Sequence, residues 1–272
     1  MENIIGIDMG GTTIKGGLIE GEFMVRQVSA DTQAQAGGDI TLNILKGVIS
    51  QLKNNNTKAI GIGVPSVVDK NKGIVYNVQN IKDWEEVHLK DLLEAEFNIP
   101  VYIDNDANCF AYGEKIFGKG RDFRNFVGIT LGTGVGGGII QNNNLLLDSN
   151  CGSGEFGEIP YLDSILEDYC SSSFFVRNAN MTGYEAAIKA KQGDLEAIRI
   201  YNEYGLHLSI LVKIIILIID PEAIIFGGSI AKSFGLFEKS MYENLKHFPY
   251  PNSVNKIQIL TSGLANLIET KS

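Results

Sequence analysis

Apolar residues along this chain alternate between short continuous runs and longer segments in which they recur every three or four positions. The run Lys58–Val64 (KAIGIGV) predicts a buried strand, because it is short and apolar and a Pro-Ser turn signal follows it. Ile40–Lys53 and Asp83–Phe97 show helical spacing, and Pro100 introduces an apolar strand at Val101–Ile103. Strands that alternate with helices of this length predict an α/β fold with a parallel component.

The second half of the chain continues this alternation. A strand at Phe126–Leu131 leads into the glycine-rich segment 132–138, and the carboxylate-rich stretch Cys151–Tyr169 predicts a loop. Asp220-Pro221 is expected to end the preceding helix. The other elements expected here are strands at Ile139–Ile140, Ala223–Phe226 and Ile257–Leu260, and helices at Gly183–Ala190, Asp194–Tyr204, Gly205–Ile219 and from Leu264.

A change of composition in the middle of the chain predicts a domain boundary. Ala107–Phe117 is expected to be helical, and a linker of glycines and charged residues, 118–122, follows it. We therefore expect an N-terminal α/β domain over 1–117 and a C-terminal α/β domain over 118–257. The C-terminal tail, about 258–272, is a candidate to pack back on the N-terminal domain.

The most apolar stretch, Leu208–Ile219, is too short to span a bilayer and contains Lys213. It predicts a buried helix rather than a membrane anchor, so no membrane partner is expected.

Charge and cysteine content narrow the classes of protein. The 272 residues carry a net charge of −9 and no basic run, which disfavours nucleic acid as a partner. Three cysteines without a CxxC pair predict free thiols in a reducing compartment. No charged, apolar and cleavable leader precedes the first strand, so a cytoplasmic location is expected.

The opening segment Ile4–Ile19 (IIGIDMGGTTIKGGLI) predicts a hairpin with a glycine turn. Glycines at Gly10 and Gly11, beside Thr12, let backbone N–H groups approach an oxyanion closely. Asp8 can hold Mg²⁺ through water, because this ion keeps most of its hydration shell. The turn therefore suits a metal-bound polyphosphate, and an ordinary hairpin with a tight Gly-Gly turn is the alternative.

A second glycine turn resembles the first. Gly6–Thr12 (GIDMGGT) and Gly128–Gly134 (GITLGTG) each follow an apolar strand, which indicates a duplicated fold with two phosphate loops. Other phosphate motifs fit poorly: GxxxxGK[ST] is absent. Gly132, Gly134 and Gly137 satisfy GxGxxG, but the chain continues as a strand where a dinucleotide fingerprint needs a helix.

Two groups of acidic residues are candidates for chemistry. Asp104 and Asp106 stand at the end of a strand, where one of them can accept a proton from an attacking hydroxyl or simply cap the next helix. The second group lies among glycines in a loop and suits recognition of sugar hydroxyls, or forms a solvated acidic loop. Its members are Glu155, Glu158, Glu167 and Asp168.

Four segments together resemble the ROK sugar kinases, glucokinase-like members of the actin-like ATPase superfamily. They stand in the family's order and cover nearly the whole chain. They are Asp8–Thr12 (DMGGT), Asp104–Asn108 (DNDAN), Leu131–Gly138 (LGTGVGGG) and Ile225–Gly228 (IFGG).

The resemblance implies an α/β protein of two RNase H-like domains, with ATP and a sugar in the cleft between them. Asp8 would bind Mg²⁺ through water, and the Gly10-Gly11-Thr12 turn would face the phosphates. The segment Gly132-Thr133-Gly134 would form the second phosphate loop, and Gly227-Gly228 would lie by the adenosine.

The same resemblance assigns the chemistry and the sugar site. Asp106 would be the catalytic base, with Asn105 beside it on the sugar. Glu155 matches the Glu of the family's ExGH segment, and Glu167 matches a later sugar-binding Glu.

Departures from the family pattern concern the sugar side. Glu158 stands where the family has the His of ExGH, and Ser66 stands where it has a Gly after the Pro of GxPG. Both positions are counted among the substrate-binding residues. The family's CxCGxxGCxE segment, which binds structural zinc together with that His, is absent. We therefore expect no structural zinc.

The resemblance thus predicts an ATP- and Mg²⁺-dependent hexose kinase that phosphorylates a sugar hydroxyl, with the 6-hydroxyl of glucose as the default acceptor. N-acetylmannosamine, allose and fructose stay open as substrates. A non-catalytic sugar-binding protein or a sugar-responsive regulator is the alternative. Regulatory members carry an N-terminal helix-turn-helix domain, for which Asp8 leaves no room here. Whether the chain forms a homodimer, for instance through Ala231–Tyr242, is left open.

Overall fold

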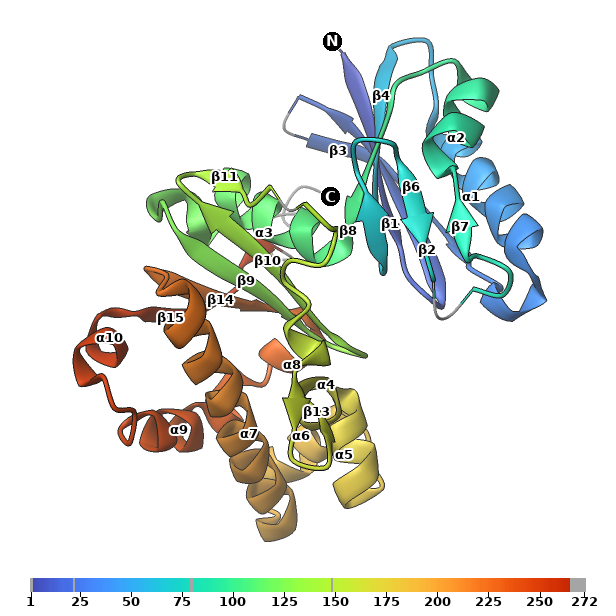
Figure 1. The fold of residues 1–272 in the computed structure, drawn as a ribbon. Coiled ribbons are helices and arrows are strands. Elements are labelled where there is room, and N and C mark those ends of the chain that lie inside the picture. The colour runs from blue at the N-terminus through green and yellow to red at the C-terminus, as the bar shows by residue number, and fades with distance from the viewer. Residues whose placement is uncertain (1, 22, 79–80, 148, 265–272) are drawn as a thin grey trace. The chain divides into compact units, whose positions relative to one another are not determined.

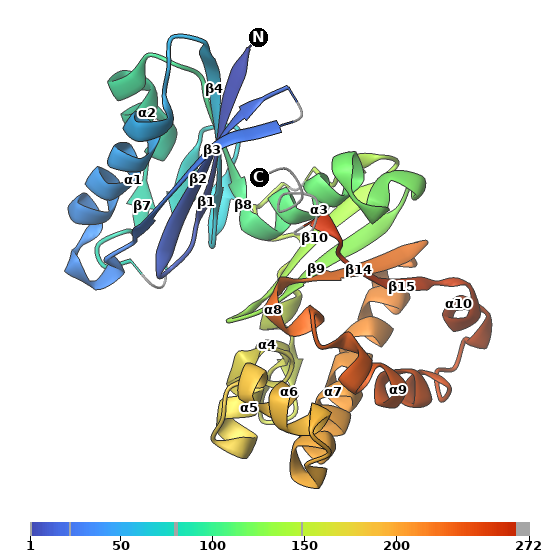
Figure 2. The ribbon, with the colours of Figure 1, turned by 180° about the vertical axis from the view of Figure 1, so that it is seen from behind.

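The computed structural model describes residues 2–21, 23–78, 81–147 and 149–264, and it divides into two compact units (Figures 1 and 2). The first comprises the described residues up to Cys109, together with Ser149–Gly152, and the second comprises the rest. The division falls inside helix α3 (Asp106–Phe117), before the predicted boundary at residue 117.

The first unit is built on a five-stranded sheet in the order β3-β2-β1-β4-β8. Its first three strands are antiparallel, whereas β1, β4 and β8 run parallel. The sheet strands are β1 (Asn3–Met9), β2 (Thr13–Glu20), β3 (Phe23–Asp31), β4 (Thr57–Val64) and β8 (Val101–Asn105). A smaller sheet joins β5 (Val67–Asp69), β6 (Ile74–Tyr76) and β7 (Glu86–Val87).

Alternation of buried and exposed side chains explains how this sheet packs. In β1 the odd-numbered residues Asn3, Ile5, Ile7 and Met9 are buried, so one face carries the core and Asp8 points to the other. Helices α1 (Gly38–Leu52) and α2 (Leu89–Phe97) contribute their apolar faces to the same core. A short 3₁₀ helix, η1 (Ala34–Ala36), precedes α1.

The second unit repeats this architecture. Its sheet has the order β11-β10-β9-β14-β15, again with three antiparallel strands followed by parallel ones. The predicted duplication is therefore confirmed at the level of topology. The strands are β9 (Phe126–Leu131), β10 (Val135–Gln141), β11 (Asn144–Leu145), β14 (Ala223–Gly227) and β15 (Gln258–Thr261).

Both faces of the second sheet are covered. In β14, Ala223 and Ile225 pack with Ala111 of α3, whereas Ile224 and Phe226 belong to the core formed with α7 (Leu195–Ile219). A strand covered on both faces is a continuous apolar run, as β14 is. Figures 1 and 2 show α3 on one side of this sheet and α7 with α9 (Phe234–Leu245) on the other.

Shorter elements complete the second unit. They are η2 (Lys119–Asp122), η3 (Phe156–Glu158), β12 (Pro160–Tyr161), β13 (Ser164–Ile165), α4 (Leu166–Cys170), α5 (Ser172–Ala179), α6 (Gly183–Lys191), α8 (Gly228–Ala231) and α10 (Pro251–Lys256). The predicted loop Cys151–Tyr169 thus contains a 3₁₀ turn, a hairpin and the start of a helix.

Several predicted boundaries are wrong. Asp194–Tyr204 and Gly205–Ile219 form one helix, α7. The helix predicted over Asp83–Phe97 begins only at Leu89, because Asp83 has a positive φ of 68° and β7 follows it. The strand predicted at Ile139–Ile140 begins at Val135 and includes the glycines 136–138.

The C-terminal tail was expected to return to the first domain. Its described part, residues 258–264, lies in the second unit, because β15 pairs in parallel with β14. The rest of the tail and most of the helix predicted from Leu264 lie outside the described residues.

Among the described residues, α7 is the helix long and apolar enough to cross a membrane by length and composition. Its residues Leu208, Leu211, Val212, Ile215 and Ile216 are nevertheless at most 4% exposed and belong to the main core of the second unit. A helix in a protein core meets the same two criteria, and the predicted buried helix is confirmed for the face that carries these residues.

Candidate active site

The carboxyl ends of β1, β4 and β8 bring the acidic residues of the first unit together. The strand register places Asp8 beside Gly63, and Gly63 beside Asp104. A Cβ on Gly63 would lie 3.5 Å from Cα of Asp106, at van der Waals distance, so the start of α3 lies directly against the sheet here. On the exposed face, Lys15 of β2 pairs directly opposite Asp8.

The first glycine turn joins β1 to β2 and is held by the end of β3. Gly10 N donates to Thr13 O at 2.9 Å and closes the turn. The fully buried Thr32 then binds the turn twice: its hydroxyl donates to Gly10 O at 2.7 Å, and its backbone N–H donates to Thr12 O at 2.9 Å. The loop conformation is therefore fixed from within the first sheet.

Asn105 caps α3 and ties the helix to a neighbouring loop. Its Oδ1 accepts from the backbone N–H groups of Ala107 and Asn108, at 2.8 and 3.2 Å. Its Nδ2 donates to Ser66 O at 3.1 Å. The amide thus performs the N-cap role that the sequence left open for the two aspartates. One N–H of its side chain is not used by these bonds.

Asp104 supports the N-cap that Asn105 forms, and Asp106 lies at the carboxyl edge of the first sheet. Asp104 Oδ1 accepts from Asn105 N and from Asn108 Nδ2, each at 2.8 Å. Asp106 is the first residue of α3 and is half-buried. Desolvation and the nearby Asp8 carboxylate raise the pKa of Asp106 to about 6, although a hydrogen bond from Ala107 N acts in the opposite direction.

Ser66 lies on the other side of Asn105. Its hydroxyl donates to the carbonyl of Tyr76 in β6, so the side chain is directed to the small sheet. The lone pairs of its oxygen are what it can offer to a ligand. Ser66, Asn105 and Asp106 are thereby brought together by contacts within the first unit.

The second glycine turn joins β9 to β10 and differs in its supports. Gly132 N donates to Gly134 O at 3.1 Å across the turn. Glu167 Oε2 accepts from Val135 N at 2.9 Å, and Ser172 N donates to Gly132 O at 2.8 Å. Glu167, predicted to bind the sugar, is therefore hydrogen-bonded to the residue that follows the predicted phosphate loop.

Gly227 and Gly228 lie beside this loop. Gly228 has a positive φ of 86°, and a Cβ there would lie 2.3 Å from Leu131 O. A Cβ on Gly227 would collide with the ring of Phe110 at 2.5 Å. Both positions therefore require glycine, because the end of β14 packs directly against the end of β9 and the start of α3.

Glu155 precedes η3 as its N-cap, Glu158 is the last residue of η3, and both are exposed. Between them, a Cβ on Gly157 would lie 3.3 Å from Glu167 Oε2, which places η3 against Glu167.

Aromatic contacts fill the region after Glu158. In the β12–β13 hairpin and the helices behind it, the Tyr161 hydroxyl lies 3.1 Å from Nδ1 of His207, and Tyr169 donates to Asp163. Arg177 covers the Tyr169 ring at 4.4 Å. Within the described residues no group of three His, Cys, Asp or Glu could hold a metal ion. The absence of structural zinc stays a prediction.

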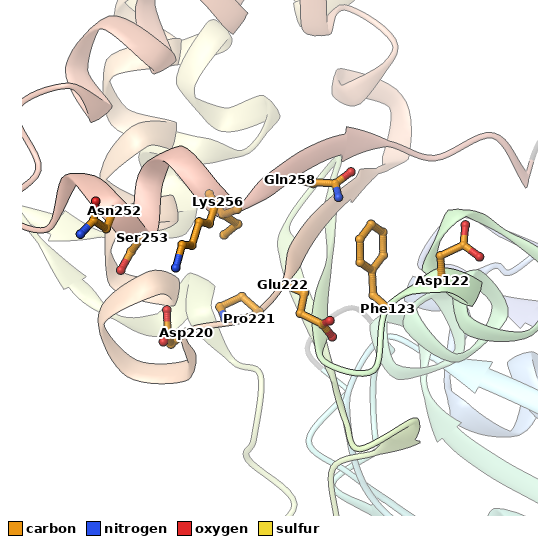
Figure 3. Close-up of a pocket in the computed structure, with 10 residues that line it drawn as sticks. Asp122, Phe123, Asp220, Pro221, Glu222, Asn252, Ser253, Lys256 and Gln258 are labelled. Atoms are coloured by element: carbon orange, nitrogen blue, oxygen red, sulfur yellow. The ribbon is translucent and has the colours of Figure 1, made fainter.

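A hollow lies at the opposite edge of the second sheet (Figure 3). It is lined by Phe123, which precedes β9, by Glu222, which precedes β14, and by Gln258, the first residue of β15, with Lys256 of α10. Glu222 Oε2 accepts from the backbone N–H groups of Arg124 and Asn125, so it serves the loop before β9. None of the predicted site residues lines this hollow.

The predicted site residues therefore form two clusters, one within each unit. The first holds Asp8, the turn 10–12, Ser66, Asn105 and Asp106, and the second holds the loop 132–134, Gly227-Gly228 and the three glutamates. Sequence reasoning missed Thr32, Gly63 and Ser172. The repeated glycines of KAIGIGV could have indicated a close approach at Gly63, whereas nothing in the sequence marks Thr32 or Ser172.

Comparisons with known proteins identify the family of the chain. A model of the ROK family matches residues 4–266. A glucokinase from Streptomyces coelicolor is 32% identical over 263 residues, 84% of this chain and 82% of that protein. A xylose repressor from Bacillus subtilis is 28% identical and is matched over 96% of this chain and 73% of the repressor.

Among solved structures, a ROK family glucokinase from Streptomyces griseus in complex with glucose and AMPPNP is similar with a TM-score of 0.81. It is 25% identical, and the match covers 96% of this chain and 95% of that one. The predicted fold class, two RNase H-like α/β domains of the actin-like ATPase type, is confirmed.

Proposed function

Because the chain belongs to the ROK family, we propose that it is an ATP-dependent sugar kinase that transfers the γ-phosphate to a hydroxyl of a hexose. The observation that carries the proposal is the environment of Asp106. It stands at the carboxyl edge of the first sheet, half-buried beside Asp8, and its pKa is raised to about 6.

Asp106 is proposed as the general base. A carboxyl with a pKa of about 6 is ionised near neutral pH and is a stronger base than an ordinary aspartate. It would accept the proton of the attacking hydroxyl while that oxygen bonds to the γ-phosphorus and the bond from phosphorus to the leaving ADP oxygen breaks. Phosphoryl transfer otherwise needs positioning and charge neutralisation.

The chain's residues suit ATP and Mg²⁺. Asp8 and Asp106 repel each other, and a divalent cation near them would relieve that repulsion. Asp8 is proposed to hold Mg²⁺ through water, and the ion when bound neutralises phosphate charge. The turns Gly10-Gly11-Thr12 and Gly132-Thr133-Gly134 offer backbone N–H groups to phosphate oxygens. Gly227-Gly228, beside the second turn, is proposed to lie by the adenosine.

The sugar would be bound by Ser66, Asn105, Glu155, Glu158 and Glu167. Glutamates accept hydrogen bonds from sugar hydroxyls, whereas the spare N–H of Asn105 donates to a sugar oxygen. The 6-hydroxyl of glucose is the proposed acceptor, in keeping with the glucokinases among the relatives.

A sugar-binding regulator is the second candidate. It is favoured by the xylose repressor among the relatives and by Glu158 at the family's histidine position. In that case the sugar residues named above would be used without turnover.

Release of ADP in a coupled assay separates these functions. The protein is supplied with ATP, Mg²⁺ and one of glucose, N-acetylmannosamine, allose or fructose. A kinase releases ADP with at least one sugar at a rate well above the rate without sugar. Binding of ATP and sugar without sugar-dependent ADP release would favour the regulator.

A further inference from the structure

The carboxylate of Glu167 lies in a notch of the second glycine loop. Its Oε2 accepts from Val135 N at 2.9 Å, at the residue where the loop returns to β10. A Cβ on Gly134 would lie 2.6 Å from the same oxygen. The carboxylate is therefore packed directly on the last glycine of the loop, and any larger residue there would displace it.

The start of the loop is held by the same segment of the chain. Ser172 N donates to Gly132 O at 2.8 Å, and Ser171 N donates to Glu167 O at 2.9 Å. Helices α4 and α5 thus supply one hydrogen bond at each end of the loop. No strand of the second sheet performs this task within the described residues, unlike Thr32 beside the first loop.

The support behind Glu167 is firm. Leu166 and Cys170, on either side of it in α4, are fully buried. The hydroxyl of Tyr204 in α7 donates to Cys170 O at 2.8 Å, and Leu166 N donates to Ile159 O at 2.9 Å. The core of the second unit therefore sets the position of the carboxylate, and the carboxylate in turn sets the position of the loop.

The third contact of this carboxylate is with η3. Gly157 packs against Glu167 Oε2, and Glu155 and Glu158 stand on either side of Gly157. Val135 O also lies only 2.8 Å from where a Cβ of Gly157 would be. One side chain therefore joins the proposed phosphate loop to the proposed sugar-binding segment.

We propose that Glu167 is a positioning residue for the loop 132–134, so that nucleotide affinity depends on a side chain of the sugar-binding segment. Its contact with Val135 N holds the loop in its phosphate-binding shape even without sugar. A sugar that restrains Glu167 or η3 also restrains the loop, so sugar and nucleotide strengthen each other's binding reciprocally. That the loop 132–134 binds phosphate rests on the proposed kinase function.

The first test needs no ligand. Amide hydrogen exchange is measured at residues 131–136 in the wild type, Glu167→Ala, Glu167→Gln and Glu238→Ala. Exchange of the Val135 amide should accelerate at least tenfold in Glu167→Ala. It should return close to the wild-type rate in Glu167→Gln, whose amide oxygen can accept the same bond. Glu238→Ala, a matched change of an exposed carboxylate in α9, should leave it unchanged.

The second test measures binding of ADP by calorimetry in the absence of sugar. Glu167→Ala should weaken ADP binding three- to tenfold, and Glu238→Ala should change it less than twofold. Unchanged exchange, or faster exchange with unchanged ADP affinity, overturns the proposal and leaves Glu167 as a sugar contact alone. Absence of ADP binding to the wild type would refute the kinase function, whereas the exchange result would still decide whether Glu167 holds the loop.

A second variant covers the case in which Glu167→Ala does not fold. Ser172→Pro removes the N–H that binds Gly132 O. Ser172 is the first residue of α5, where proline is tolerated, and Ser171 has the extended conformation that a residue before proline prefers. Faster amide exchange in the loop with a retained fold is expected if α4 and α5 hold the two ends of the loop. Unchanged exchange contradicts this.

Discussion

The two glycine turns occupy equivalent places in two sheets of the same strand order, yet they are held in different ways. Thr32, at the end of the neighbouring strand β3, holds the first with an uncharged hydroxyl and a backbone N–H. Glu167 and Ser172, from helices outside the sheet, hold the second. The first turn is thus part of its own sheet, whereas the second depends on the segment proposed to recognise the sugar.

The difference extends to the ends of the parallel strands. In the first unit the fifth strand, β8, is followed by Asp106, whereas β15 in the second unit is followed by Ser262, which donates to the buried Glu114. Asp106, whose pKa is raised, follows the fifth strand of the first sheet, whereas a serine follows the fifth strand of the second. The two units thus share a strand order but differ in the residue at this edge.

The largest expected effect concerns this asymmetry. Asp106→Asn should lower kcat by about 100- to 10,000-fold, because a general base contributes about that much. Affinity for ATP should stay within twofold, as measured by calorimetry. Asp122→Asn, the same change beside the hollow of the second unit, should leave kcat unchanged. A kcat within tenfold of the wild type in Asp106→Asn would contradict the base assignment.

The second-largest effect is a loss of stability at Gly228, which directly follows β14. Gly228→Ala forces a side chain to 2.3 Å from Leu131 O at a positive φ, so it should cost about 2–4 kcal/mol of unfolding free energy in urea. Gly47→Ala, in the open interior of α1, should instead stabilise by up to about 1 kcal/mol. A Gly228→Ala protein as stable as the wild type would show that the contact with Leu131 is not restrictive.

The support of the first turn should be weaker but measurable. Thr32→Val removes the donor to Gly10 O in a fully buried place, which should cost about 1–2 kcal/mol of unfolding free energy. Amide exchange should accelerate in the first turn and not in the second. Thr13→Val, in the adjacent strand, serves as the matched change and should cost less than about 0.5 kcal/mol. Equal acceleration in both turns would mean that their supports are not independent.

The smallest effect is a pH dependence of stability. The pKa of Asp106 is raised from 3.8 to about 6 on folding, so the folded protein binds this proton more tightly than the unfolded chain. Stability from this group is therefore present below about pH 4 and is lost as the pH rises to about 6. Asp106→Asn should gain on the order of 1 kcal/mol over the wild type at pH 7, after allowance for solvent screening, and nothing at pH 4. A difference that does not vary with pH would refute the raised pKa.

Sequence patterns predicted the parts of the fold that rest on local periodicity. The opening hairpin, strand β9, helix α1 and the repeated topology are confirmed, because apolar spacing and turn glycines determine them. Gly205 was predicted to begin a separate helix, but α7 runs through it. A Cβ there would lie 2.1 Å from Oγ of Ser240 in α9, so the glycine serves helix packing, which is invisible in one sequence.

The glycines of β10 misled in the same way. Gly137 is part of β10, and a larger residue would not fit there because Phe156 and Gly154 O occupy the space of a side chain. For the site, the sequence predicted the residues of the two clusters, and the ligands of both clusters stay predictions. The supports at Thr32, Gly63 and Ser172 could not be predicted, because long-range backbone contacts, not motifs, create them.

The side-chain amide of Asn105 has a consequence for which sugars can be told apart. Three of its hydrogen-bonding positions are taken by Ala107, Asn108 and Ser66, which fixes the orientation of the group. In the proposed kinase, one hydrogen is left to address a single lone pair. A single N–H group can donate to one sugar oxygen, but this bond does not distinguish on which side of the ring a neighbouring hydroxyl lies. Discrimination between epimers would therefore fall to the acceptor-only glutamates of the second unit, and changing the preferred sugar should begin there rather than at Asn105.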